Sequence, residues 1–177
     1  RDRLSVGQIV YSAMCYENGT MFDDGTLLKL SDHGFRWVCG DEYGGEWLKE
    51  QAKKKNYKVH IKNSTDQINN LSLQGPKSRK ILEKIIFTPP TQPSISELEW
   101  FRFSICRLEE LNGIPLIVSR TGYTGELGFE IWCHPSDAPT VWDKVMEAGK
   151  DEGLIPAGFA ALDLLLSLIH ISEPTRP

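Results

Sequence analysis

The side chains best suited to chemistry are gathered in one short stretch, residues 119–130. It holds an arginine, two acids, two aromatic residues and three glycines. The glycines would let the backbone approach a flat ligand, the aromatic rings could stack on it, and Glu130 offers two acceptor oxygens. A hairpin with a glycine-rich turn would use the same residue types. Composition alone leaves these two interpretations evenly matched.

Two adjacent carboxylates, Asp23 and Asp24, form a second candidate group. Apolar pairs lie on both sides of them, so the chain could carry one acid into a site of low dielectric constant. A carboxylate held there could bind an amine or stabilise positive charge that develops during a reaction. The alternative is a polar turn that ends at Gly25, and the residues by themselves favour that turn.

The composition and charge of the chain restrict its class. With 177 residues, 40% of them apolar, the chain suits one domain with a buried core. The net charge is −4 and no basic block is present, which disfavours a nucleic-acid partner. No apolar run reaches the roughly 18 residues of a membrane-spanning helix, so no membrane partner is expected.

The cysteines and histidines are scattered along the chain. The four cysteines lie in apolar, strand-like contexts without a Cys-x-x-Cys pair, and we expect buried free thiols in a reducing compartment. This favours a cytoplasmic location, or the mitochondrial matrix in a eukaryote. Neither residue type shows ligand spacing, so no metal site is expected. The cysteines are Cys15, Cys39, Cys106 and Cys133.

The predicted elements are clustered by type rather than alternating. Apolar and alternating runs predict strands over residues 8–15, 26–30, 35–39, 57–61, 68–73, 101–108, 114–119 and 130–133. Helices are predicted over residues 46–54, 76–86, 137–149 and 157–165, with a short helix at a capping box formed by Ser94 and Glu97. This order favours an α+β fold, with antiparallel sheets backed by helices.

Five motifs, in order along residues 6–165, resemble the aminomethyltransferase family. That family comprises the folate-binding T-protein of the glycine cleavage system and its tetrahydrofolate-dependent demethylase relatives. The resemblance implies a folate-binding domain of α+β lobes around a central cavity. The motifs are Val6-Gly7-Gln8 with Tyr11, Asn18-Gly19 leading to Asp23-Asp24, Leu73-Gln74-Gly75-Pro76, the stretch 119–130, and Gly153-Leu154-Ile155-Pro156 leading to Ala161-Leu162-Asp163.

The resemblance implies roles for individual residues. Asp24 occupies the catalytic position, where it would orient the reacting amine against N5 of tetrahydrofolate and stabilise an iminium-like transition state; Asp23 would support it. Glu130 would accept two parallel hydrogen bonds from the 2-amino group and ring N–H of the pterin. Tyr123 would pack on the folate ring, and Val38 is a third predicted folate contact. Arg120 is expected to pair with a carboxylate, such as that of Glu126.

Two positions depart from the glycine cleavage T-proteins. Leu162 stands where those proteins usually carry an arginine that helps to hold folate, and Gly40 stands where they tend to carry asparagine. Both changes affect ligand contacts rather than the scaffold. They favour a paralogue that uses the same folate with another methylated substrate.

The predicted function is therefore a one-carbon transferase that uses tetrahydrofolate. Its substrate would be a small methylated or aminomethyl compound, presented on a lipoyl carrier protein if the chain is a true T-protein. The first alternative is a non-catalytic folate-binding module of an amine dehydrogenase or demethylase, which would keep Glu130 and Tyr123 but need no Asp24. The second is a structural segment without a ligand.

The last residues do not follow the pattern of the rest. Residues 166–177 break the preceding helical periodicity and resemble the translation of a sequencing-library adapter, so we expect a non-native tail there. Family members extend beyond both ends of the chain. Residues 1–165 are therefore predicted to be part of a folate-binding domain, inactive when isolated.

Overall fold

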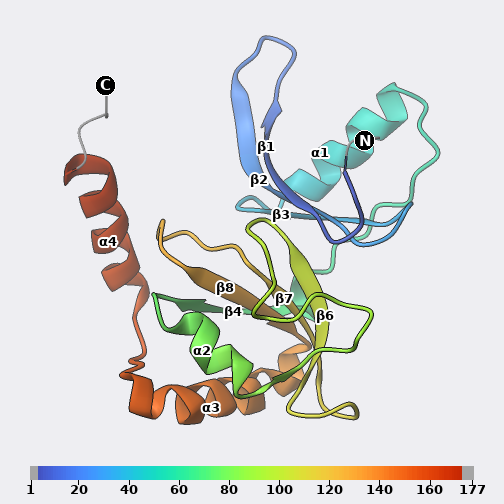
Figure 1. Ribbon diagram of the computed structural model, residues 1–177. Coiled ribbons are helices and arrows are strands. Elements are labelled where there is room, and N and C mark those ends of the chain that lie inside the picture. Colours follow the sequence, from blue (N-terminus) through green and yellow to red (C-terminus); the bar gives the residue numbers. More distant parts are fainter. Residues whose placement is uncertain (1–3, 173–177) are drawn as a thin grey trace. The chain divides into compact units, whose positions relative to one another are not determined.

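The computed structural model describes residues 4–172, without the side chains of residues 167–172. The chain divides into two compact units, Arg1–Thr65 and Asp66–Pro177 (Figure 1). Each unit has its own antiparallel sheet, one of three strands and one of five. The predicted α+β class with antiparallel sheets and helices is therefore confirmed, while the central cavity stays a prediction.

The first unit is a three-stranded meander with one helix. Its strands are β1 (Ile9–Cys15), β2 (Met21–Lys29) and β3 (Phe35–Cys39), and β2 lies in the middle. Helix α1 (Gly44–Lys54) packs on this sheet, because the ring of Trp47 stacks on Phe22 with centroids 5.9 Å apart. A Cβ added at Gly44 would lie 2.9 Å from the sulfur of Cys39, so the helix begins in close contact with β3.

Strand β2 begins five residues earlier than predicted. It includes Asp23 and Asp24, which pair across the ladder with Met14 and Ala13 of β1. The interpretation of this acidic pair as a polar turn is therefore wrong. The hairpin turn lies between β1 and β2, where Gly19 has a φ of 84° that favours glycine.

The second unit contains a five-stranded antiparallel sheet in the order β4-β8-β7-β6-β5. Helices α2 (Ser78–Glu83) and α3 (Ala138–Gly149) pack against each other and against this sheet (Figure 1). Phe129 and Ile131 of the sheet join Leu82 and Val141 of the helices in one buried cluster. The strands are β4 (Asn69–Gln74), β5 (Ile86–Phe87), β6 (Phe103–Leu108), β7 (Pro115–Ser119) and β8 (Gly128–Cys133).

Strand alternation divides the side chains of this sheet between two faces. Phe129, Ile131 and Cys133 of β8 point into the cluster shared with the helices. Glu130 and Trp132 alternate with them and therefore lie on the opposite face. The candidate pterin anchor thus belongs to the face of the sheet that the two helices do not cover.

Several predicted elements differ in length or type. The predicted strand 57–61 is irregular, because none of the ladders among the described residues includes it. The predicted helix 76–86 ends at Glu83, since Ile86 pairs with β6 instead. The hydroxyl of Ser94 accepts from the backbone amide of Glu97 at 3.4 Å, which is one hydrogen bond of the expected capping box, but the two residues close a turn rather than start a helix.

Helix α4 (Phe159–Ser172) continues beyond the predicted end at residue 165. The helix therefore does not end where the non-native tail was expected to begin, and the non-native origin of that tail stays a prediction; residues 173–177 lie outside the described residues. Within the described residues, none of the helices is long and apolar enough to cross a bilayer.

The cysteines are all free, but they are not all buried. Cys106 and Cys133 are buried as predicted, and burial raises the pKa of both thiols. Cys39 is half-buried and Cys15 is exposed, so the prediction is wrong for Cys15. Cys15 ends β1, where the β1–β2 register shifts after Met14, so an apolar strand context did not suffice to bury this thiol.

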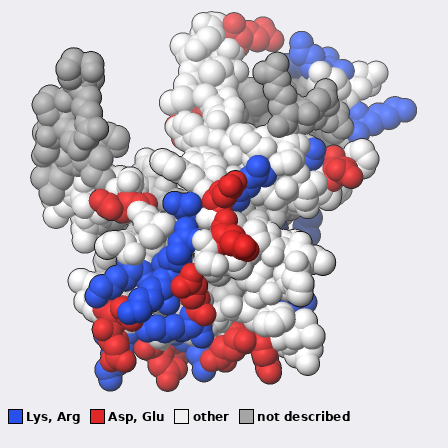
Figure 2. All heavy atoms as spheres, in the orientation of Figure 1, with Lys and Arg blue, Asp and Glu red and all other residues white. Residues whose placement is uncertain are grey.

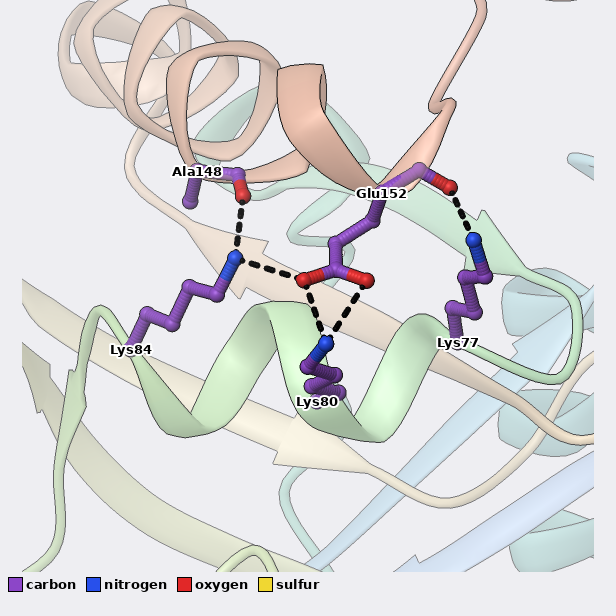
Figure 3. A network of polar contacts seen from close by, with 5 residues as sticks. All are labelled: Lys77, Lys80, Lys84, Ala148 and Glu152. Carbon is purple, nitrogen blue, oxygen red and sulfur yellow. Dashed lines mark hydrogen bonds and ion pairs between the residues drawn. The ribbon is translucent and has the colours of Figure 1, made fainter.

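Glu152 ties α2 to the segment after α3 (Figure 3). Its carboxylate lies 2.8 Å from the amine of Lys80 and 3.0 Å from that of Lys84, and its carbonyl accepts from Lys77 at 2.8 Å. Its side chain is only 9% exposed. Lys80 and Lys84 lower the pKa of Glu152 to about 2. Figure 2 shows lysines and arginines interleaved with acidic side chains over α2 and α3.

We expect Glu152→Gln to lower the melting temperature near pH 7, because both lysines lose a carboxylate partner. A carboxyl whose pKa falls on folding stabilises the protein above its unfolded pKa, and that contribution is lost as the pH falls through the folded value, here about 2. The difference in melting temperature between variant and parent should therefore shrink between about pH 5 and pH 2. Thermal unfolding followed by circular dichroism measures it.

The matched control is Glu147→Gln. Glu147 is 78% exposed and only 4.0 Å from Lys144, so its removal should change the melting temperature little at any pH. An equal loss in both variants, or a Glu152→Gln difference that persists near pH 2, would contradict the assigned ion pairs.

Candidate functional site

Asp24 lies on one face of the three-stranded sheet together with Tyr11 and Val38. Thr26 of β2 pairs with Tyr11 on one side and with Val38 on the other, and Asp24 precedes Thr26 by two residues. All four side chains therefore project to the same face. The hydroxyl of Tyr11 donates a hydrogen bond to Oδ2 of half-buried Asp24. The structure thus brings together two of the predicted site residues, Asp24 and Val38.

Tyr11 is a residue whose role sequence reasoning missed. It stands in a matched motif, but nothing in the motif indicated which side chain it touches. The signal was present in the hairpin: with the turn at Gly19, Tyr11 and Asp24 become diagonal neighbours across β1 and β2.

The side chain of Asp23 projects to the opposite face of β2 from that of Asp24, where it stabilises the backbone. Its carboxylate accepts hydrogen bonds from the backbone amides of Asp24, at 2.8 Å, and Asp41, at 3.0 Å. Burial raises the pKa of Asp23, but these backbone hydrogen bonds outweigh it, so the pKa of this carboxyl lies below its ordinary value. Asp23 therefore holds the loop after β3 in place, mainly through hydrogen bonds from the backbone.

Gly25, next to Asp24, is required by the close approach of two strands. A Cβ at this position would lie 2.0 Å from the backbone carbonyl oxygen of Val38. Any larger residue would push β3 away from β2, because the atom in its way belongs to the backbone and not to a flexible side chain. Glycine at this position therefore allows β3, which carries Val38, to pack closely against β2, which carries Asp24.

Glu130 lies in β8, between β4 and β7, on the face without helices. It is half-buried. One of its carboxylate oxygens accepts from the side-chain amide of Asn70, at 2.7 Å, and the other accepts from the hydroxyl of Thr121. An ionised carboxylate has about four lone-pair sites, so each oxygen can still accept one further donor. A ligand with two parallel N–H groups matches these remaining sites.

Tyr123 belongs to the loop that joins β7 to β8, and its side chain is 73% exposed. This loop is anchored by Gln74, which belongs to the motif Leu73-Gln74-Gly75-Pro76 but was not among the predicted site residues. The amide nitrogen of Gln74 lies 3.5 Å from the carbonyl of Thr121 and 3.4 Å from that of Phe129, and its oxygen accepts from Thr124 at 3.3 Å. Gln74 thus fastens both ends of the loop while Tyr123 stays accessible.

The glycines at the ends of this loop leave space for a neighbouring side chain, and one between them has a backbone conformation that favours glycine. A Cβ at Gly122 would lie 2.2 Å from the side-chain oxygen of Gln74, and one at Gly128 would lie 1.7 Å from it. These two glycines make room for Gln74, and Gly125, with φ 71°, serves the turn. Gly122 and Gly128 thus have a structural reason in the packing of Gln74, and close approach to a ligand stays a prediction.

The remaining predicted contacts are spread over both units. Arg120 donates to the backbone carbonyl of Leu98 at 3.3 Å, in place of the expected pairing with Glu126. Leu162 lies in α4 and is half-buried. Asp24 and Val38 belong to the first unit, and Glu130 and Tyr123 to the second. Among the residues with a described structure, no group of three or more His, Cys, Asp or Glu side chains is placed to hold a metal ion.

Comparisons with known proteins place these residues in a family context. Residues 2–166 match the family model described as the GCVT N-terminal domain. The chain is 51% identical over 162 residues to a trimethylamine-oxide aldolase from Ruegeria pomeroyi, covering 92% of this chain and 20% of that protein. It is 39% identical over 166 residues to an aminomethyltransferase from Alkaliphilus metalliredigens, covering 92% and 42%.

A solved structure agrees with the fold. The glycine cleavage system aminomethyltransferase T from Bartonella henselae superposes with a TM-score of 0.68 over 93% of this chain and 41% of that one, at 24% identity. The chain thus spans about two fifths of the length of the aminomethyltransferases it matches and one fifth of the aldolase. Because the family model matches residues 2–166, which is most of the chain, the chain belongs to the GCVT N-terminal domain family, the family of the aminomethyltransferases.

Proposed function

We propose that this chain is the folate-binding part of a one-carbon transferase that uses tetrahydrofolate. The observation that carries the proposal is Glu130: a half-buried carboxylate, oriented by Asn70 and Thr121, with one acceptor site left on each oxygen. The pterin of folate presents an amino group beside a ring N–H, which is the complementary pair of donors. When bound, tetrahydrofolate supplies the nitrogen that accepts the one-carbon unit.

The protein's part in the reaction is positioning and electrostatic stabilisation. Asp24 orients the substrate amine and stabilises the positive charge that develops as its carbon–nitrogen bond breaks. Tyr11 supports this role, because its hydroxyl fixes the direction of the Asp24 carboxylate. Val38, on the same face, and Tyr123, exposed in its loop, offer apolar and aromatic surface to the folate.

The substrate class is a small methylated amine. Leu162 and Gly40 depart from the residues expected of a glycine cleavage T-protein, which argues against an aminomethyl group on a lipoyl carrier. The 51% identity to a trimethylamine-oxide aldolase points in the same direction, since that protein is named for a methylated nitrogen compound. A lipoyl carrier partner remains the expectation only for the T-protein alternative.

A second candidate is a folate-binding module that does not itself break the substrate bond. The aldolase relative favours it, because four fifths of that protein lies outside the match and could hold a separate active site. Trimethylamine oxide contains the same atoms as dimethylamine and formaldehyde together, so cleavage of one of its carbon–nitrogen bonds without another reactant would give these two products. The module would then bind the folate that takes up the formaldehyde, and Asp24 would not be needed for the cleavage.

An assay of the complete gene product separates the two candidates. Trimethylamine oxide is supplied with and without tetrahydrofolate, and dimethylamine, formaldehyde and folate-bound one-carbon product are quantified. Transfer by this domain predicts that carbon–nitrogen cleavage requires both tetrahydrofolate and Asp24. The module predicts cleavage without either, with free formaldehyde released when folate is omitted. An aminomethylated lipoyl carrier tests the T-protein alternative, and failure to form folate-bound product from any of these donors would refute the transferase proposal.

A further inference from the structure

Three buried polar side chains of the second unit form a hydrogen-bonded series that ends on Glu130. The indole nitrogen of Trp132 lies 3.0 Å from the hydroxyl oxygen of Ser119. That hydroxyl lies 2.8 Å from the hydroxyl of Thr121, which in turn bonds Oε2 of Glu130. Trp132, Ser119 and Thr121 are 9%, 1% and 7% exposed, so water does not compete for these contacts.

The chemistry of the two ends fixes the direction of the series. An indole N–H can only donate, and an ionised carboxylate can only accept. The hydroxyl of Thr121 therefore donates to Glu130, and in the hydrogen bond between Ser119 and Thr121 the donor must be Ser119. The other acceptor near Ser119, the carbonyl of Glu130, is more distant at 3.4 Å. All three donors thus point toward the carboxylate, an arrangement in which each hydrogen bond strengthens the next.

The register of the sheet assembles this series. Ser119 pairs directly with Glu130 across β7 and β8, and Trp132 follows Glu130 by two residues on the same face. Thr121 lies two residues beyond Ser119, just outside the strand. A one-residue slip between β7 and β8 would move Ser119 and Thr121 away from Glu130 and Trp132, so the series depends on the register of the sheet.

We propose that Trp132, Ser119 and Thr121 are positioning residues, which orient the Glu130 carboxylate so that its remaining acceptor sites meet a ligand with two parallel N–H donors. This inference rests on the proposed folate site and adds to it the groups that set the direction of its anchor. Asn70 holds the other oxygen. The carboxylate is therefore held on both oxygens before the ligand arrives, which reduces the entropy lost on binding.

Thr121→Val tests the proposal, because valine keeps the shape of threonine and removes the hydroxyl. Measured by titration calorimetry on the complete gene product, tetrahydrofolate affinity should fall roughly tenfold. Thr121→Ser restores the donor and should recover most of the parent affinity. Trp132→Phe removes the donor at the far end of the series and should weaken binding by a smaller factor, about two- to threefold.

The control is Ser104→Ala in β6. Ser104 is fully buried, like Ser119, but its hydroxyl donates to the carbonyl of Pro93 at 2.8 Å and lies outside the series. Its variant should bind tetrahydrofolate like the parent. Equal losses in Thr121→Val and Ser104→Ala, or no recovery in Thr121→Ser, would refute the positioning role and indicate a general packing effect.

The result for Glu130→Ala distinguishes this inference from the proposed function. If Glu130→Ala weakens folate binding while Thr121→Val and Trp132→Phe do not, the series has no positioning role and the folate site stands. If Glu130→Ala leaves folate affinity unchanged, the anchor itself is wrong and the inference fails with it. If Thr121→Val does not fold, the other two variants still test the positioning role. Thr121→Ser must then bind tetrahydrofolate with nearly the parent affinity, and Trp132→Phe must bind it more weakly.

Discussion

Replacing Asp24 with asparagine should lower turnover of the complete gene product by at least about tenfold, or roughly 1.4 kcal/mol of transition-state stabilisation. The substitution keeps the shape of the side chain and removes the negative charge that would face a developing positive charge. Folding should be preserved, because the side chain of Asp24 accepts a hydrogen bond from Tyr11, and an asparagine oxygen can still accept it. Steady-state kinetics at saturating tetrahydrofolate measure the effect.

The neighbouring Asp23 provides a matched control. Asp23→Asn removes the same charge one residue away, on the opposite face of β2. Its carboxylate serves the amides of Asp24 and Asp41, so the main expected effect is a lower melting temperature, with a smaller loss of turnover than in Asp24→Asn. Parent-like turnover in Asp24→Asn would remove Asp24 from the chemistry and favour the non-catalytic module.

Glu130→Ala should weaken tetrahydrofolate binding roughly 10- to 100-fold, or about 1.4 to 2.8 kcal/mol. The variant loses the acceptors for two ligand donors, and it also leaves Asn70 and Thr121 without the carboxylate they orient. Because the effect is on ligand binding, it should appear in the dissociation constant and in KM for folate. Calorimetric titration of parent and variant measures it directly.

The control for Glu130 is Glu126→Ala, which removes an exposed carboxylate from the same β7–β8 connection. This variant changes the net charge equally and should bind tetrahydrofolate like the parent. Comparable weakening in both variants would mean that folate responds to overall charge, and unchanged affinity in Glu130→Ala would exclude Glu130 as the anchor.

The two substitutions are expected to act on different kinetic quantities. Asp24→Asn removes an interaction that strengthens as the reaction proceeds, which lowers kcat. Glu130→Ala removes an interaction present in the bound ground state as well, which raises KM for folate. A variant pair that shows this division supports separate catalytic and anchoring roles for two side chains from different units of the chain.

Local patterns predicted most of the elements correctly. The β2–β3 hairpin follows from two strand-like runs on either side of Asp32-His33-Gly34, and the β6–β7 hairpin follows from two apolar runs around Asn112-Gly113. These signals are local, because turn residues and side-chain alternation are properties of neighbouring positions. The predicted strand 57–61 shows the limit, since alternation alone cannot supply the neighbouring strand that a sheet requires.

The sequence alone determined the α+β class and, through the resemblance of five ordered motifs, the family; it also predicted Asp24, Glu130 and Tyr123 as site residues, and these remain predictions. Only the tertiary structure decided how they are supported: Tyr11 beside Asp24, Asp23 turned to the backbone, Gln74 between Gly122 and Gly128, and the series from Trp132 to Glu130. The physical reason is register. These contacts join residues from different strands, and which side chains meet depends on the pairing of whole strands rather than on any local pattern.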